Sequence, residues 1–98
     1  MNMQAMLKQA QNLQKNMMKE KEEIDNSEFT GTSSFVTVKL SGDKKIKEVK
    51  IDRESLDSED IEMLQDILVV AINNAMNEID KVTNEKMGKY TKGMPGLF

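Results

Sequence analysis

The sequence contains no cysteine, no histidine and no tryptophan, and aromatic residues make up only 4% of its 98 residues. Without cysteine the chain forms no disulfide and no thiolate zinc site. Without histidine it lacks the side chain most often used as a general base and as a metal ligand. No apolar run is long enough to span a bilayer or to serve as a signal peptide. We therefore expect a cytoplasmic protein with no membrane partner.

The sequence also lacks the patterns that carry catalysis or bind nucleotides. Its five glycines match neither nucleotide-binding glycine motif, and no serine stands in a recognisable nucleophile elbow. Carboxylates cluster between residues 54 and 66, but their spacing does not match a calcium-binding loop, and a helix start explains them more simply. We therefore expect a protein that is not an enzyme and has no metal, no cofactor and no small-molecule substrate. A hydrolase or metal enzyme built on this cluster is the alternative that the sequence supports least.

The composition fits a single folded domain over residues 1–98, because two domains would each be too short to bury a core. The formal net charge is −3, and acidic and basic residues are segregated along the chain. Six cations lie in the stretch from residue 39 to 53, just before the acidic cluster. The distribution of charge matters more than its sum. The acidic balance therefore excludes a uniformly basic surface but does not exclude DNA as a partner.

The first segment predicts a helix over about residues 3–25. Its apolar residues recur at spacings of three, four or seven, which is a heptad seam, and Glu20 takes the one place where the seam is polar. The seam consists of Met3, Met6, Ala10, Leu13, Met17 and Ile24. Lys8, Lys15 and Lys19 fall on one stripe roughly opposite the seam. Such a stripe is more often an ordinary solvated face than a binding surface, and both interpretations stay open at this point.

A small antiparallel sheet of three strands is predicted over about residues 28–52. A short strand comes first, and two longer strands over 35–40 and 46–51 follow as a hairpin, with Gly42 in the turn between them. Both long strands alternate between apolar and polar residues. The hairpin therefore has one apolar face and one polar face that carries lysines.

A longer second helix is predicted over about residues 58–88, with Ser58 as its N-cap and carboxylates in its first turn. The stretch 67–72 is apolar on every side of this helix. A helix that is apolar all round must be buried all round, and one small sheet with one other helix covers only part of it. A second copy of the chain is the simplest cover, since two-fold homodimers are common. The predicted dimer interface consists of Leu64, Ile67, Leu68, Ala71, Ile72 and Ala75.

Beyond Val82 the apolar stripe of the second helix thins, and lysines follow. Gly88 and Gly93 weaken the helix, and we expect a flexible tail over residues 89–98. Basic stripes at both helical ends are able to contact phosphates, but similar stripes occur on proteins that never bind DNA. From its residues alone, the chain is predicted to be a dimeric α+β interaction module.

The order and spacing of these segments resemble the YbaB/EbfC family of bacterial nucleoid-associated proteins over about residues 3–98. The matching segments are 6–11 and 22–24 in the first helix, 36–42 and 49–52 in the sheet, 62–66 with Ala71, Asn73 and Ala75 in the second helix, and Gly93-Met94-Pro95-Gly96-Leu97-Phe98 at the end. The resemblance implies an α-β-β-β-α protomer, with a small three-stranded sheet between two long helices, and an intertwined, tweezer-like homodimer. It also implies a nucleoid-associated protein that binds double-stranded DNA and influences nucleoid organisation and gene expression.

The resemblance supplies the DNA partner and, within the matched helix, Lys8 as a contact, whereas the placement of charge supplies the other candidate contacts. The predicted DNA-binding residues are Lys8, Lys15, Lys19, Lys81, Lys86, Lys89 and Lys92. Phosphate contacts position a protein without reading sequence, so we expect weak sequence preference. The alternative is a protein-interaction module in which the Met-rich seam, with Met3, Met6 and Met17, binds a partner protein and DNA plays no part.

Overall fold

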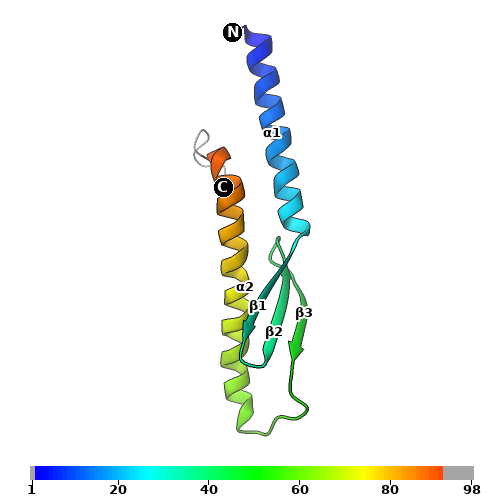
Figure 1. Cartoon of the computed structure of the whole chain (residues 1–98), viewed down its shortest axis with the longest axis vertical. Helices are drawn as coiled ribbons and strands as arrows, with labels where there is room; N and C mark the ends of the chain where they lie inside the picture. Colours follow the sequence, from blue (N-terminus) through cyan, green and yellow to red (C-terminus); the bar gives the residue numbers. More distant parts are fainter. Residues whose placement is uncertain (1, 92–98) are drawn as a thin grey trace.

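Two long helices and a three-stranded antiparallel sheet make up the computed structural model, which describes residues 2–91 (Figure 1). The elements follow in the order α1 (Met3–Asn26), β1 (Glu28–Ser33), β2 (Val36–Ser41), β3 (Ile46–Ile51) and α2 (Asp60–Thr91). The α-β-β-β-α order and the antiparallel sheet predicted from the sequence are therefore confirmed. The molecule is elongated because α1 extends past the sheet and beyond the last turn of α2 (Figure 1).

Hydrogen bonds at both ends of α1 satisfy backbone groups that the helix leaves without an internal partner. The side chain of Asn2 accepts a hydrogen bond from the backbone N–H of Ala5 at 2.7 Å, which caps the N-terminus. At the other end, the N–H of Ser27 donates to the carbonyl oxygen of Ile24 at 3.0 Å. Ile24 is the buried residue of this helix, and most of the others are exposed. α1 therefore projects from the sheet as a long, solvated rod.

β2 is the centre of the sheet, with β1 and β3 as its antiparallel neighbours. Val38 lies opposite Gly31 in β1 and opposite Val49 in β3, and residues that lie opposite each other point to the same face. The apolar residues of all three strands therefore share one face. β1 is longer than the short strand predicted, because its small polar residues continue the pairing as far as Ser33, opposite Val36.

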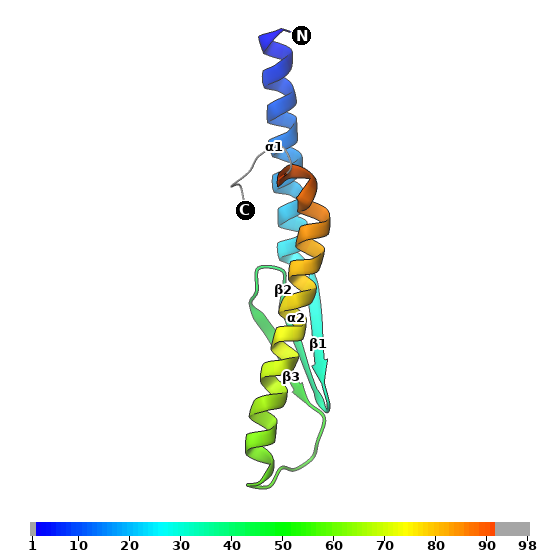
Figure 2. The same ribbon diagram turned by 90° about the vertical axis from the view of Figure 1, so that its left-hand side faces the viewer.

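α2 packs across β1 and β2 on the apolar face of the sheet (Figure 2). Val36, Val38 and Leu40 of β2 are completely buried in the resulting core. At Gly31 the helix backbone comes so close that a Cβ atom there would lie 2.0 Å from the carbonyl oxygen of Ala71. This position therefore requires glycine for reasons of space.

α2 begins two residues later than the sequence predicted. Ser58 is not the N-cap, since it lies in a turn before the helix. The first helical residue is Asp60, whose carboxylate accepts a hydrogen bond from the backbone N–H of Asp57 at 3.1 Å. Hydrogen bonds with Asp57 lower the pKa of Asp60, and Arg53, whose guanidinium lies 3.8 Å away, adds to this effect. This part of the acidic cluster therefore has a structural role at the start of the helix.

The far end of α2 also differs from the prediction. The helix continues through Gly88 to Thr91, so residues 89–91 are not part of a flexible tail. A glycine inside a helix costs about 1 kcal/mol relative to alanine. Burial of Met87 and Tyr90 in the apolar core offsets this cost, because both side chains lose nearly all contact with solvent. The rest of the predicted tail, residues 92–98, lies outside the described residues.

Candidate nucleic-acid interface

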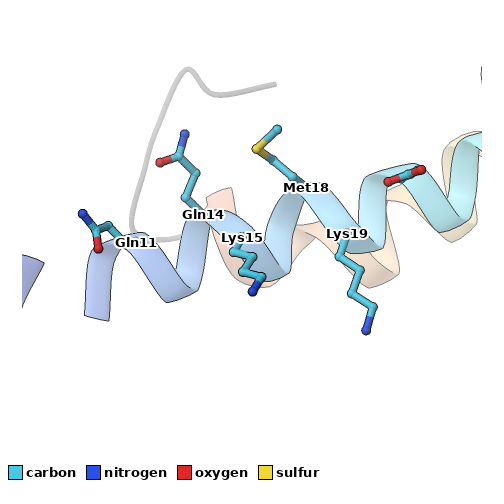
Figure 3. Close-up of a pocket in the computed structure, with 6 residues that line it drawn as sticks. Gln11, Gln14, Lys15, Met18 and Lys19 are labelled. Carbon is cyan, nitrogen blue, oxygen red and sulfur yellow. The ribbon is translucent and has the colours of Figure 1, made fainter. Parts of the chain in front are cut away.

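The outer part of α1 together with its N-cap, residues 2–19, forms an arm that contains three lysines and no carboxylate. The carboxylates of the sequence all lie between residues 20 and 85. The arm is therefore locally positive, although the chain carries a net charge of −3. Lys15 and Lys19 point to the same side of α1 (Figure 3), and helical periodicity places Lys8 on the same stripe. At about 1.5 Å per residue the stripe is roughly 16 Å long, which exceeds the width of the DNA major groove of about 12 Å.

Within the described part of the chain, the three arm lysines have no carboxylate partner. Lys8, Lys15 and Lys19 are exposed and make no ion pair with any residue of the described range 2–91. The cations that do lie next to a carboxylate are Lys21, Lys39, Lys44, Lys45, Arg53 and Lys89. A lysine without a partner is able to contact a phosphate without first breaking an ion pair. The arm is therefore well suited to neutralise a polyanion.

A shallow hollow of about 460 Å³ lies on the arm beside two of these lysines (Figure 3). Its lining residues are Gln11, Gln14, Lys15, Met18, Lys19 and Glu22. Side-chain amides and lysines both donate hydrogen bonds to phosphate and sugar oxygens, which fix the position of a protein on a duplex. The hollow is formed by a single helix and is open to solvent, so it offers a contact surface for a backbone and not an enclosed site for a small molecule.

The predicted lysines of α2 differ in their surroundings. Lys81 and Lys86 are exposed and, like the arm lysines, make no ion pair within the described part of the chain. Lys89 instead donates a hydrogen bond from Nζ to Oε1 of Glu20 at 2.9 Å. Lys92 lies outside the described residues. Lys89 is therefore partly neutralised. Lys81 and Lys86 are more available than Lys89 for a contact with phosphate.

The Glu20–Lys89 contact shapes the electrostatics where α1 meets α2. The hydrogen bond from Lys89 is the main cause that lowers the pKa of Glu20, and the nearby positive charge of Lys86 acts in the same direction. The same hydrogen bond raises the pKa of Lys89. Lys19 and Lys89 line one hollow at this junction, so the structure brings together two predicted sites from opposite ends of the chain.

The polar face of the sheet carries charges of both signs. Lys39 lies 3.7 Å from Glu28 and 3.6 Å from Glu48, and so stands between two carboxylates. Lys47 and Lys50 of β3 are exposed and make no ion pair among residues 2–91. With two carboxylates among its cations, this face has a weaker positive potential than the arm.

A second surface of the protomer is apolar and uncovered. α2 contacts β1 and β2 but not β3, so the apolar side chains of β3 are not covered by a helix. Val49 is 44% exposed, and Ile51 beside it is also exposed. On α2, Val69 is 58% exposed. The single chain therefore buries only one side of the apolar stretch 67–72.

Contacts on the two sides of α2 identify the side that is turned toward β3. Asn74 donates a hydrogen bond to the carbonyl oxygen of Thr32 in β1 at 3.0 Å. Asp80 pairs instead with Lys44, in the turn between β2 and β3, at 3.1 Å. At about 100° per residue, Val69 falls on the same side of the helix as Asp80. Val69 therefore lies on the β3 side of α2, and we call the exposed Val49, Ile51 and Val69 the apolar flank.

The structure changes the set of residues available for a dimer interface. Ala71 and Ala75 are completely buried against β1, close to Gly31, so they have no surface left for a partner. The other predicted interface residues are half-buried and pack against the core: Leu64, Ile67, Leu68 and Ile72. The sequence did not predict that apolar residues of β3 are exposed. The alternation of β3 revealed an apolar face, but not that α2 leaves this face uncovered.

No group of three or more histidine, cysteine, aspartate or glutamate side chains among residues 2–91 is placed to hold a metal ion. In the same range, neither helix combines the length and the apolar character needed to cross a membrane.

The fold and these surfaces place the chain among small α+β proteins that extend a positively charged helical arm from a sheet-and-helix body. The chain belongs to the YbaB/EbfC DNA-binding family, whose model matches residues 1–94, and the resemblance seen in the sequence is thereby confirmed. A relative from Lactococcus lactis subsp. cremoris, named nucleoid-associated protein, is 50% identical over 97 residues, which cover 97% of this chain and 98% of the relative. A relative of the same name from Ligilactobacillus salivarius is 48% identical over 99% of this chain and 95% of its own length.

A solved structure supports the fold independently of close sequence similarity. The crystal structure of an uncharacterized protein from Helicobacter pylori matches with a TM-score of 0.75 at 20% sequence identity. The match covers 92% of this chain and 97% of the other. At this identity the likeness concerns the fold alone.

Proposed function

We propose that this protein is a nucleoid-associated protein that binds double-stranded DNA as a homodimer and catalyses no reaction. The observation that carries the proposal is the arm, with three exposed lysines that make no ion pair among the described residues and no carboxylate over residues 2–19. Membership of a family described as DNA-binding supports it, as do relatives named nucleoid-associated proteins. In this role the protein resides in the cytoplasm on the nucleoid, where it influences nucleoid organisation and gene expression.

The proposed mechanism rests on phosphate contacts. Lys8, Lys15 and Lys19 approach the DNA backbone along one stripe and release the counterions condensed on it. Contacts of this kind position the protein without reading bases, which gives weak sequence preference. A homodimer presents two arms, and neutralising about six phosphates gives log affinity a slope of roughly −5 against log salt concentration. Lys81 and Lys86 add contacts if the duplex extends over α2.

In this proposal the homodimer forms through the apolar flank. Burying an exposed valine or isoleucine side chain contributes about 1.5–3 kcal/mol, and a two-fold axis applies the same surface twice. Val49, Ile51 and Val69 supply the exposed apolar area. The half-buried residues at the edge of this interface are Leu64, Ile67, Leu68 and Ile72.

The direct test compares DNA binding by the wild type and by a Lys8→Glu/Lys15→Glu/Lys19→Glu variant across a salt series. We expect the wild type to bind with a slope of roughly −5, and the variant to lose binding because its arms repel phosphates. The matched control is Lys45→Glu/Lys47→Glu/Lys50→Glu, which changes the net charge equally but lies on the sheet and its turn. This control should keep most of the affinity.

Light scattering on both variants confirms that any loss of binding does not come from loss of the dimer. A slope near zero for the wild type would contradict the phosphate mechanism. Equal losses in the two triple variants would show that only total charge matters, and would remove the arm from the proposed site.

A second candidate function is a protein-interaction module. It is favoured by the exposure of Met3 and Met6 on the outer part of the α1 seam, since exposed methionines suit adaptable binding surfaces. A pull-down at moderate salt after nuclease treatment separates the two functions. Partners bridged by DNA are lost under these conditions, whereas proteins bound directly to the seam are retained.

A further inference from the structure

The apolar seam of α1 is covered along only part of its length. Near the sheet, Ile24 is buried and Met17 packs against the core, where α2 runs alongside α1 (Figure 1). Farther out, Met6 is 57% exposed, and Met3 and Leu13 are exposed as well. Heptad spacing keeps all of these residues on one face of the helix. Among the described residues, α2 and the core therefore cover only the part of the α1 seam that is near the sheet.

The cover ends where the described part of α2 ends. The contact between Lys89 and Glu20 places the last turn of α2 beside the C-terminal half of α1. α2 runs in the opposite direction to α1, toward the outer end of that helix (Figures 1 and 2). The chain therefore leaves α2 at Thr91 next to the point where the seam becomes exposed.

The residues that follow Thr91 are numerous enough to reach the exposed seam. An extended chain spans about 3.3 Å per residue, so residues 92–98 reach at most about 23 Å. Along α1, the rise from Glu20 to Met6 is about 21 Å at 1.5 Å per residue. The segment is thus able to extend along the seam as far as Met6.

The composition of this segment suits an apolar cover better than further helix. Pro95 cannot donate a helical hydrogen bond, and it is flanked by glycines within two residues on either side. Met94, Leu97 and Phe98 are large and apolar. The opposing surface on α1 is a shallow hollow of about 250 Å³ lined by Met3, Met6, Leu7 and Ala10. The segment and the hollow are therefore chemically matched.

We propose that residues 93–98 pack along the outer seam of α1 in the same chain, defined as Met6, Ala10 and Leu13, and so extend the α1–α2 contact toward the tip of the arm. The chain's own segment is favoured over a second copy because a short tether gives it an effective concentration in the millimolar range. The arm lysines lie on the opposite side of α1, so the docked segment leaves them open. The proposal does not depend on DNA binding.

Methionine oxidation measures this cover without any ligand. Met6 and Met18 have nearly equal exposure in the described structure, at 57% and 61%, but Met18 lies off the seam. In the full chain treated with dilute hydrogen peroxide, we expect Met6 to oxidise several-fold more slowly than Met18, as measured by mass spectrometry of peptides. Met87, which is buried, serves as the protected reference.

A Leu97→Ser/Phe98→Ser variant tests whether the segment is the cover. Because both positions lie outside the described core, the variant should fold, and buried Met87 should stay protected. We expect Met6 to become as reactive as Met18 in this variant. Equal reactivity of Met6 and Met18 already in the wild type would overturn the proposal. Protection of Met6 that persists in the variant would also overturn it, since another surface would then be the cover.

Disulfide trapping identifies which chain supplies the segment, and the absence of native cysteine makes the result simple to interpret. An Ala10→Cys/Leu97→Cys variant should form a link within one chain, which keeps the mass of a single chain on a non-reducing gel. The matched control, Lys8→Cys/Leu97→Cys, places the first thiol on the lysine side of α1 and should link far less. Links predominantly between two chains would overturn the proposal in favour of a second copy.

Discussion

The Nζ atom of Lys89 lies 2.9 Å from Oε1 of Glu20, a contact between residues 69 positions apart in the sequence. Glu20 occupies the place in the α1 seam where heptad spacing calls for an apolar residue. Its partner lies in the last turn of α2, so the pair joins the two helices at the point where the arm begins. The contact thereby links the stability of the junction with the charge available for DNA.

The first prediction concerns the pH dependence of this junction. The hydrogen bond from Lys89 lowers the pKa of Glu20 below its ordinary value of 4.5. A group with a lowered folded-state pKa adds stability above its unfolded pKa, and this stability is lost as the pH falls through the folded value. We expect Glu20→Gln to unfold at lower urea than the wild type at neutral pH, with the difference disappearing in acid.

Urea unfolding followed by circular dichroism over an acid pH series checks this prediction. Glu22→Gln is the matched control, because Glu22 is exposed on the same helix and makes no ion pair among the described residues. Its midpoint should follow that of the wild type at every pH. If Glu20→Gln and the wild type differ by the same amount in acid and at neutral pH, ionisation of Glu20 does not support the junction.

The second prediction concerns the stability that Lys89 contributes to the same junction at alkaline pH. The pKa of Lys89 is raised, mainly by its hydrogen bond to Glu20, so its contribution is complete below the ordinary lysine value of 10.5. That contribution is lost as the pH rises through the folded-state pKa. We expect Lys89→Met to lower the urea midpoint at neutral pH and to converge with the wild type at strongly alkaline pH. Parallel midpoints over the whole range would contradict this linkage.

The third prediction concerns the DNA affinity of Lys89. Because Glu20 partly neutralises Lys89, we expect Lys89→Ala to weaken DNA binding less than Lys15→Ala. Glu20→Gln releases Lys89 and should make the salt slope more negative by about one for each lysine gained. This gain should be absent in a Glu20→Gln/Lys89→Ala double variant. A gain that survives in the double variant would mean that removing a negative charge, and not releasing Lys89, increases the affinity.

The fourth prediction compares two glycines. A Cβ atom on Gly31 would lie 2.0 Å from a backbone oxygen of α2, so Gly31→Ala should force the helix from the sheet and cost about 3 kcal/mol or more of unfolding free energy. Gly88 lies inside α2, and a Cβ atom there meets nothing within 4 Å. Gly88→Ala should therefore stabilise the protein by about 0.5–1 kcal/mol. Denaturant unfolding measures both, and equal effects would refute the proposed close approach.

The fold was predictable because each element has a clear local pattern. The heptad seam of α1 and the alternation of β2 specify the two kinds of secondary structure. The boundaries of α2 were less accessible, since Tyr90 and Met87 keep the helix intact past Gly88 only through their burial in the core. That burial depends on tertiary packing, which a local pattern does not contain.

The candidate site was only partly predictable. The arm lysines follow from helical periodicity, but the pairing of Lys89 with Glu20 joins residues too distant in sequence for a local pattern. Similarly, Ala71 lies in an apolar stretch that suggested a dimer interface, and the structure buries it against β1. Which side of an all-apolar helix faces the sheet depends on where the strands lie in the folded chain, and here the backbone of α2 at Ala71 and Ala75 approaches β1 closely at Gly31.

The fifth prediction concerns the apolar flank. If Val69 lies in the dimer interface, Val69→Glu places a charge there that the partner does not neutralise, and two-fold symmetry applies the penalty twice. We expect the dimer dissociation constant to rise by about a hundredfold or more, as measured by light scattering over a dilution series. Thr30→Glu is the matched control, since it adds the same charge to an exposed position on β1.

The consequence for DNA follows from the number of arms. A monomeric Val69→Glu variant carries one arm, so its salt slope should fall to about half the dimer value while Lys8, Lys15 and Lys19 stay intact. Circular dichroism confirms that the variant remains folded. A dimeric Val69→Glu variant would exclude the apolar flank as the interface. A monomeric variant that keeps the full slope would show instead that a single protomer makes all of the phosphate contacts.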